Sequence, residues 1–391
     1  MAFLVACNGH STSNDEDRAP EAPPDPGVLH FGRDDVARPS RATAVTIEVT
    51  GLGAWGAGDS LQLVSPSTGT TLAALENDLP AYPSRGSTTI TGQQLDWNKL
   101  GAPLIDAAQG DTTYVTQLVQ HPGYASLGRA GIATGLTIRD GAPATLRAQL
   151  APIAQDRKLD LRWQGRAFAA LAAQAGPGAT PAPMAAIAIS ALPEPLAHHN
   201  SFATTHFAGL PNLAVVGPQL ASSDAELAIE YGSPFQAWTE LVSVVYTMNV
   251  PVTTAQGASS LPARIVAAIP VDQLANGALA PPISPVQNAR IGDHSLAVAQ
   301  QGLGAGAVVA WDAPATGHAT AYTVELRAVE SSARGVELPV VIALHTQSQQ
   351  VQLPALPPGK TYVLTITAIS AAHGATLPYA SADYVTAQLS L

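Results

Sequence analysis

The stretch LPPGKTYVLTITAIS (residues 356–370) combines a turn with a strand, and it decides the fold of the C-terminal part of the chain. Its Pro-Pro-Gly at 357–359 is a turn signal, because proline fixes φ and glycine accepts conformations that other residues avoid. Apolar side chains then follow at every second position, at Tyr362, Leu364, Ile366 and Ala368. This spacing places them on one face of an extended strand. The stretch therefore predicts a half-buried strand directly after a tight turn.

Short alternating segments lie on both sides of that stretch. AVVAWDAP (307–314) contains Trp311, and AYTVELRAVE (321–330) repeats apolar side chains at every second residue from Tyr322. Further strand patterns cover 339–346, 349–356 and 384–391. Short runs of this kind, separated by turns, are typical of a β-sandwich. We predict a sandwich over residues 281–391, in which residues 371–383 form a solvated loop between the last two strands.

This segment resembles a fibronectin type III domain over roughly its whole length. The resemblance rests on Trp311, Tyr322 and the Leu-x-Pro-Gly-x-x-Tyr pattern that runs from Leu356 to Tyr362. It implies that the tryptophan and the leucine fill the core between two sheets, with Tyr322 beside them. It also implies a tyrosine corner, in which the Tyr362 hydroxyl bonds back to the preceding loop. Another immunoglobulin-like sandwich is the alternative. The sequence contains no Arg-Gly-Asp triplet, so integrin-type adhesion through that motif is not supported.

The middle of the chain also has strand patterns, and no family resemblance is apparent there. One set lies within 42–152, with Asp-Gly at 140–141 as a natural tight turn, and a second set lies within 153–280. Residues 165–176 are Ala-rich and end at Gly-Pro, which predicts a helix. We expect a β-sandwich over 42–152 and a second β-rich domain over 153–280, with one joint unit as the alternative. No strict internal repeat is visible.

The N-terminal residues carry a possible lipid-attachment signal. Leu4-Val5-Ala6-Cys7 resembles a bacterial lipoprotein box, in which the signal is cut before the cysteine and the sulfur takes a diacylglycerol. Only six residues precede Cys7, and none is Lys or Arg, so either the true start lies upstream, or the sequence has been trimmed, or the match is accidental and Cys7 is a stray cysteine in a tail. The resemblance implies a membrane partner through the lipid. Residue 8 is Asn rather than Asp, so outer-membrane location is the default. Residues 1–41 are then a signal remnant and a polar, Pro-rich tether.

Composition excludes several classes of protein. The net charge is −11, and no Lys/Arg cluster is present, so we expect no nucleic-acid partner. Cys7 is the only cysteine, so the fold has no internal disulfide. Only 12% of the residues are charged, while 46% are hydrophobic, which provides ample apolar material for packed cores.

Candidate chemistry is sparse. His198, His199 and His206 lie close together, but the sequence has no His-Glu-x-x-His helix, and we predict no metal there. The hydrolase pattern Gly-x-Ser-x-Gly is missing from the sequence. Residues 231–235 and Trp238 form an aromatic turn, which could line a ligand groove but more commonly covers the end of a sandwich.

These observations predict an all-β protein of tandem β-sandwich domains with a C-terminal fibronectin type III-like module. We expect a bacterial cell-envelope lipoprotein that binds or scaffolds without catalysis and without a cofactor, with an unidentified protein or polysaccharide as its ligand. The alternative is a secreted or envelope hydrolase, with its catalytic part in 42–280 and the type III module as an accessory. A subunit of a surface assembly would differ from the first hypothesis only in having a constant partner.

Overall fold

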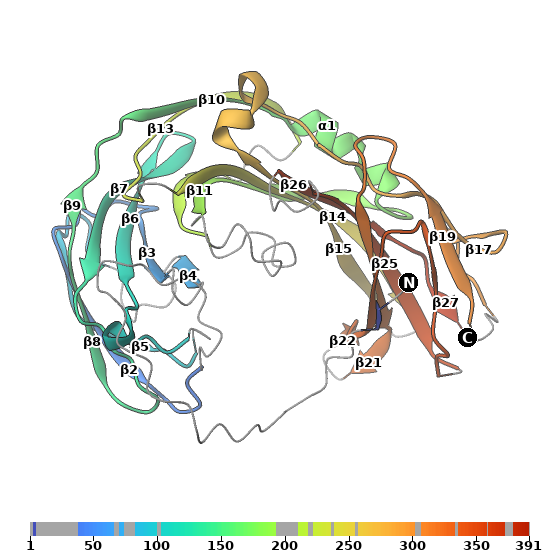
Figure 1. Ribbon diagram of the computed structural model, residues 1–391, viewed down its shortest axis with the longest axis horizontal. Coiled ribbons are helices and arrows are strands. Elements are labelled where there is room, and N and C mark those ends of the chain that lie inside the picture. Colours follow the sequence, from blue (N-terminus) through green and yellow to red (C-terminus); the bar gives the residue numbers. More distant parts are fainter. Residues whose placement is uncertain are drawn as a thin grey trace.

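The computed structural model describes residues 3–4, 38–65, 70–73, 83–99, 103–192, 210–217, 222–235, 238–254, 257–301, 306–332, 335–357, 359–371 and 378–390. These residues form three successive β-sandwiches that follow one another around an arch (Figure 1). The fold is all-β, as the alternating sequence patterns predict.

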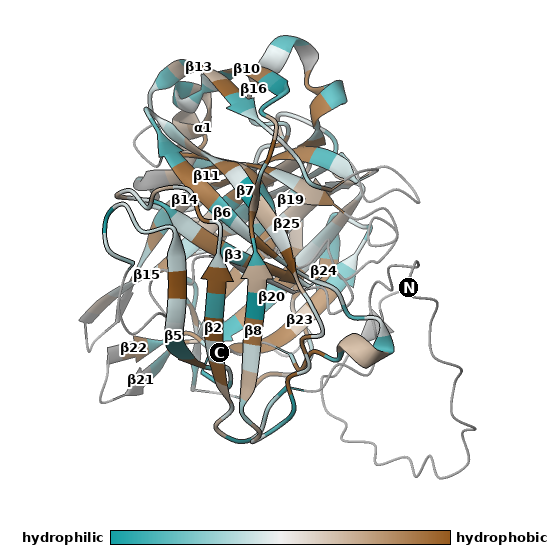
Figure 2. Ribbon diagram, turned by 90° about the vertical axis from the view of Figure 1, so that its left-hand side faces the viewer, coloured by the Kyte–Doolittle hydropathy of each residue, from teal (hydrophilic) through white to brown (hydrophobic). Residues whose placement is uncertain are grey.

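The first sandwich occupies residues 38–152. Its short sheet joins β2 (Ala44–Thr50), β5 (Thr89–Asp96) and β8 (Ala144–Gln149). The facing strands are β3 (Ser60–Ser65), β4 (Thr70–Ala73), β6 (Thr113–His121) and β7 (Tyr124–Ala133), and β9 (Ala151–Pro152) pairs with β7. Figure 2 looks onto the short sheet, whose strands carry alternating hydrophobic and hydrophilic bands. The buried positions of β2 (Val45, Ile47 and Val49) point into a separate core that also holds Trp97.

The second sandwich covers residues 153–280. Its short sheet contains β10 (Arg157–Gln164), β13 (Asp224–Tyr231) and β16 (Ala278–Leu279). The facing strands are β11 (Thr180–Leu192), β12 (Asn212–Val216), β14 (Thr239–Thr254) and β15 (Gly257–Pro270). The predicted helix at 165–176 is a helix α1 (Gly165–Ala170) continued by a 3-10 turn (Ala172–Gln174). Further 3-10 turns are Ala107–Gln109, Val271–Gln273 and Ala275–Gly277.

The third sandwich holds the C-terminal strands. One sheet contains β17 (Gln287–Ile291), β18 (His294–Ser295), β19 (Val308–Asp312) and β24 (Gln350–Gln352). The other contains β20 (Ala321–Ala328), β23 (Val340–Thr346), β25 (Thr361–Ala371), β26 (Tyr379–Val385) and β27 (Leu389–Ser390), while β21 (Glu330–Ser332) and β22 (Gly335–Glu337) form a hairpin. The loop predicted at 371–383 is too long, because its last residues belong to β26 and are mostly buried by pairing on both sides.

The first two sandwiches repeat one topology that the sequence does not reveal. In the first, β2 pairs antiparallel with β5 and parallel with β8. In the second, β10 pairs in the same way with β13 and β16. Their facing sheets also agree, with the orders β4-β3-β6-β7 and β12-β11-β14-β15. The third sandwich follows the same plan except at one place: β17, which precedes the other strands and runs antiparallel to β19, replaces the parallel seventh strand.

The facing sheets of the three sandwiches join into one long sheet of fifteen strands among the described residues. At the first junction β12 pairs with β7, with Val215 opposite Ala125. At the second, β26 pairs with β15, with Ala382 opposite Ile265. At the far end, the backbone of β1 (Phe3–Leu4) pairs with β23. The sandwiches are therefore fused edge to edge, because backbone ladders continue across both junctions.

Candidate functional site

The four residues that carry the type III resemblance lie in or against the core of the third sandwich. Trp311 on β19 is 1% exposed, and its ring meets that of Tyr322 on β20 edge to face, with centroids 5.2 Å apart. Tyr362 is buried, and its hydroxyl donates to the Pro357 carbonyl oxygen at 3.4 Å, as in a tyrosine corner. Leu356 departs from the expectation: it is only partly buried and packs against the core from its rim, while Leu353 is 4% exposed.

Several sequence predictions concern residues without a described position. Cys7, His198, His199 and His206 lie outside the described residues. Within the described ranges, no group of three or more His, Cys, Asp or Glu side chains could hold a metal ion. In that same part of the chain, no helix is long and apolar enough to cross a membrane.

The aromatic turn of the second sandwich is part of the first junction. The rings of Phe235 and Trp238 stack with centroids 4.4 Å apart. Tyr114 on β6 of the first sandwich meets Phe235 edge to face at 5.1 Å. Phe235 is 3% exposed, so these rings fill the contact between two sandwiches and leave Phe235 no open surface. Burial raises the pKa of Tyr114.

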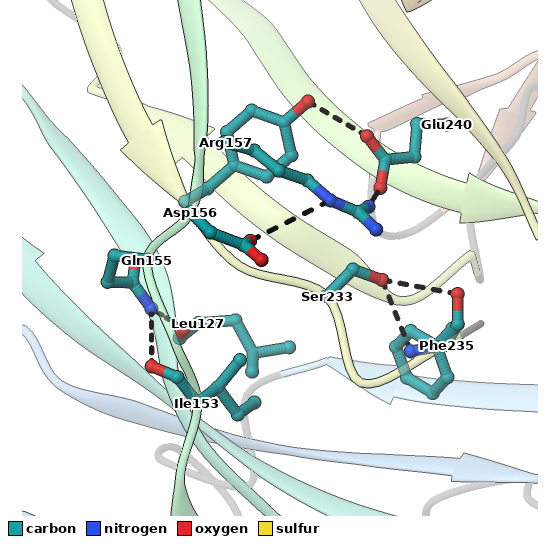
Figure 3. A network of polar contacts seen from close by, with 9 residues as sticks. Leu127, Ile153, Gln155, Asp156, Arg157, Ser233, Phe235 and Glu240 are labelled. Carbon is teal, nitrogen blue, oxygen red and sulfur yellow. Dashed lines mark hydrogen bonds and ion pairs between the residues drawn. The ribbon is translucent and has the colours of Figure 1, made fainter.

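A polar network lies beside these rings (Figure 3). Arg157 forms an ion pair with Glu240, and the Tyr231 hydroxyl donates to the Glu240 Oε2 atom at 2.9 Å. Burial raises the pKa of Tyr231, and the Arg157 charge opposes that rise. Nearby, the Gln155 amide donates to the Leu127 carbonyl oxygen at 2.9 Å. The network satisfies polar groups where the chain passes from the first sandwich to the second, which is a structural role.

Side chains also extend the backbone pairing at this junction. The fully buried Gln62 amide on β3 donates to the Asn212 carbonyl oxygen at 3.1 Å and accepts from the Asn212 N–H at 3.0 Å. These two bonds reproduce the pairing that a neighbouring strand would make. The first junction is therefore held by a backbone ladder, a bidentate amide and an aromatic contact.

The second junction is equally close. The Val385 N–H at the end of β26 donates to the Ala175 carbonyl oxygen at 2.8 Å. Gly176 follows with a φ of 150°, and a Cβ there would lie 2.4 Å from the Val385 carbonyl oxygen. Buried apolar residues of the second and third sandwiches form one continuous cluster. The two sandwiches thus share a core as well as a sheet.

The strongest candidate for a functional surface is the face of the long sheet that points away from this core. Figure 1 shows β10, β13, β17 and β19 on the outside of the arch, with β14, β15 and β25 towards its inside. We call the side of β14, β15 and β25 that points away from the core the inner face. In-register pairing brings polar residues of six strands into one line on it: Thr247, Arg264, Asp383, Thr367, Thr323 and His345. We call this line the polar row.

Hydrogen bonds connect members of the polar row. The Asp383 carboxylate accepts from the Thr367 hydroxyl at 2.8 Å and from the Arg264 backbone N–H at 2.9 Å. The Thr323 hydroxyl and the His345 Nδ1 atom are 3.0 Å apart. Neighbouring strands are about 4.8 Å apart, so six strands span roughly 24 Å. The row offers hydroxyl, imidazole and guanidinium groups along that length, which suits hydrogen bonding to an elongated ligand.

An apolar cluster lies beside the polar row on the same face. Val266, Ala268 and Tyr379 alternate with core residues of β15 and β26 and pack together with Leu241. Burial raises the pKa of Tyr379, as does the Asp383 charge, while its hydrogen bond with Ser381 acts in the opposite direction. The buried members of this cluster are at most 4% exposed, so the part of the inner face beside the polar row is covered within the protein.

Sequence reasoning did not find the polar row. Each member is one polar residue in an alternating strand, and such residues usually face solvent without further function. The row exists only because of the pairing between strands that are distant in sequence, such as β15 and β26.

Comparison with known proteins agrees with the fold of the third sandwich. Residues 295–379 match the family model of the fibronectin type III domain. The match includes β19, β20, β23, β24 and β25 and ends where β26 begins. A search of curated protein sequences found no match.

Solved structures give only distant similarity. The FN1–FN3 domains of chicken CNTN1 align over 84% of this chain and 89% of that chain, with 11% identity and a TM-score of 0.16. Salmonella alpha-2-macroglobulin, in a mutant form and in a methylamine-reacted form, aligns over 91% and 92% of this chain with 13% and 11% identity and TM-scores of 0.14. This chain spans 24% of each of those two chains.

The sheet order, the buried Trp311 and the family match agree on the C-terminal unit. Tandem β-sandwiches of this kind suggest a binding or scaffolding role. The chain is an all-β protein whose last sandwich is a fibronectin type III domain.

Proposed function

We propose that this protein is a non-catalytic binding and scaffolding protein of the bacterial cell envelope, anchored through Cys7. The observation that carries the proposal is the fusion of three sandwiches into one arch with a polar row on its inner face. The ladder between β15 and β26 and the core shared by the second and third sandwiches fix the positions of the row's strands before any ligand arrives. A preorganised surface loses less conformational entropy on binding than a flexible one.

The ligand that suits the polar row best is an elongated, uncharged polar polymer, and we propose a polysaccharide. Asp383 is already engaged by Thr367 and by the Arg264 backbone, so its charge is compensated locally by donors. The threonine hydroxyls can both donate and accept, which matches the hydroxyl groups of sugars. Glu325 and Arg327, next to the row on β20, pair with each other at 2.6 Å and so add no net charge.

A binding experiment tests this role. The double variant Thr323→Val and Thr367→Val keeps the side-chain shape and removes two hydroxyls from the row. We expect it to lose about 5- to 150-fold affinity for purified envelope polysaccharides, since two lost hydrogen bonds together contribute about 1–3 kcal/mol. Thr50→Val on the exposed end of β2 is the matched control and should bind like the wild type. Equal binding by all three proteins, or binding only to a protein segment, contradicts the proposed ligand.

The anchor needs a separate test. Expressed from its native open reading frame in a Gram-negative host, the wild type should incorporate labelled palmitate and partition into detergent. Cys7→Ser should do neither, because two or three acyl chains are needed for stable anchoring and this sulfur starts their attachment. If Cys7→Ser fractionates with membranes as the wild type does, the anchor hypothesis fails.

No arrangement among the described residues of 42–280 favours the hydrolase hypothesis, so we do not propose it as a second function.

A further inference from the structure

The strand β23 lies at the edge of the long sheet in the third sandwich, and its sequence carries no protecting residue. Its sequence, VVIALHT, contains no Lys, Glu, Asp or Pro. Val340 and Val341 at its start are 44% and 47% exposed, and they are two of the five large hydrophobic residues exposed in the described part of the chain. Edge strands of soluble proteins usually carry charges, prolines or covering segments, because a bare edge pairs readily with another strand.

Another edge strand of the same protein follows that rule. The edge strand β13 of the second sandwich carries Asp224, Glu226 and Glu230 along its length. The short edge strands β4 (TTLA) and β24 (QVQ) also lack such residues, so β23 differs from them in its length and in the exposure of its valines.

The structure itself seats an extended segment on this edge. The β1 backbone runs antiparallel to β23, with Phe3 opposite His345 and Leu4 opposite Leu344. Figure 1 places the N-terminus beside the third sandwich. The two seated residues are uncharged in sequence, and their backbone is extended. They also lie within the segment that cleavage before Cys7 would remove.

We propose that the free edge of β23 is a strand-addition site for an extended, uncharged apolar segment of a partner protein, and that β1 (Phe3–Leu4) occupies it until the N-terminal segment is removed. The removal step rests on the proposed anchoring at Cys7, whereas the strand-addition site does not. While it is attached to the chain, the N-terminal segment competes with the partner's segment for the β23 edge at an effective concentration on the order of 1 mM. Its loss would therefore switch the site from closed to open.

A labelled peptide with the sequence of residues 2–6, AFLVA, tests the site on the full chain. In the variant Phe3→Pro with Leu4→Pro, the cis segment cannot form a ladder, because proline has no N–H and fixes φ. By fluorescence anisotropy we expect this variant to bind the peptide about tenfold more tightly than the wild type, given the cis competition. The peptide APPVA should not bind to either protein.

Substitutions on β23 locate the binding. In the double-proline background, Ala343→Lys places a lysine on the strand next to Leu344 and should weaken peptide binding at least about tenfold, as edge lysines do in natural sheets. Val298→Lys, at a valine that is 59% exposed, is the matched control and should leave binding unchanged.

Three outcomes would overturn the proposal: no peptide binding by the double-proline variant, binding that Ala343→Lys leaves intact, or a concentration-dependent dimer that excludes the peptide. The last outcome would assign the edge to a second copy of the chain. None of these measurements needs cleavage or lipid. A failed palmitate experiment with successful peptide binding therefore rejects the anchor alone, and the reverse result rejects the strand site alone.

Discussion

Gly176→Ala tests how tightly the second and third sandwiches are joined. The added Cβ would lie 2.4 Å from the Val385 carbonyl oxygen and 3.1 and 3.3 Å from two methyl groups of Val250. Real Cβ atoms keep at least 3.0 Å, so the junction must open by about 0.6 Å (3.0 − 2.4). Overpacking of this kind costs about 1–3 kcal/mol, and loss of the Val385–Ala175 hydrogen bond adds about 1 kcal/mol. We expect a loss of about 2–4 kcal/mol in the free energy of unfolding, beyond the cost of the positive φ.

The matched control is Gly135→Ala. Gly135 has a φ of 65°, and nothing lies within 4 Å of its Cβ position. This variant should therefore lose only the backbone contribution to the free energy of unfolding, about 1–2 kcal/mol. Urea denaturation followed by tryptophan fluorescence measures both variants, and a split into two transitions in Gly176→Ala would show that the sandwiches unfold separately. If Gly176→Ala is no less stable than Gly135→Ala, the junction is loose and the reasoning about a rigid arch is wrong.

Three further substitutions test the third sandwich and the first. Trp311→Ala should destabilise the protein by about 3–5 kcal/mol in urea denaturation, because it empties a core position, and a change below 1 kcal/mol would contradict that role. Tyr362→Phe should cost about 0.5–1.5 kcal/mol by the same assay, since one long hydrogen bond is lost, and an unchanged midpoint would argue against the corner. The hydrogen bond from the Ser40 hydroxyl, joined by backbone donors, lowers the pKa of Asp140 below 3.8 in the folded state. Its contribution is therefore complete above that pH and lost as the pH falls below it; Asp140→Asn should flatten this part of the stability profile, and an identical acid profile would refute the assignment.

The sequence predicted the third sandwich well because its signals are local. The turn at 357–359 and the alternation after Tyr362 specify β25, and the burial of Trp311 follows from its place on β19. Leu356 was predicted less well. The chain leaves the sheet at Gln352, so Leu353 is buried first and Leu356 remains at the rim.

The repeat of the first two sandwiches was not predictable in this way. Their common plan lies in strand order, and β2 and β10 share no visible sequence pattern beyond alternation. Alternation specifies which face of a strand is buried and does not specify its partner. The same limit hid the polar row, since Thr367 and Asp383 become neighbours only through the pairing of β25 with β26.

The order of strands at the two junctions explains why the arch ends where it does. At the first junction, β7 at one end of the first sandwich's facing sheet pairs with β12 at the opposite end of the second's. The first two sandwiches therefore follow each other head to tail along the long sheet. At the second junction β15 pairs with β26, which occupies the same place in the third sandwich as β15 does in the second. The order of strands in the third sandwich is therefore reversed along the long sheet. This reversal hides the edge of β26, which a head-to-tail series would leave free, and presents β23 instead. A strand at that position is hydrogen-bonded on one side only, since β20 is its single neighbour within the sandwich. Among the described strands that the third sandwich contributes to the long sheet, β23 is therefore the one whose outer backbone edge has no partner in any of the three sandwiches. Its sequence is apolar and uncharged, so a strand from outside the sandwich can complete the ladder there.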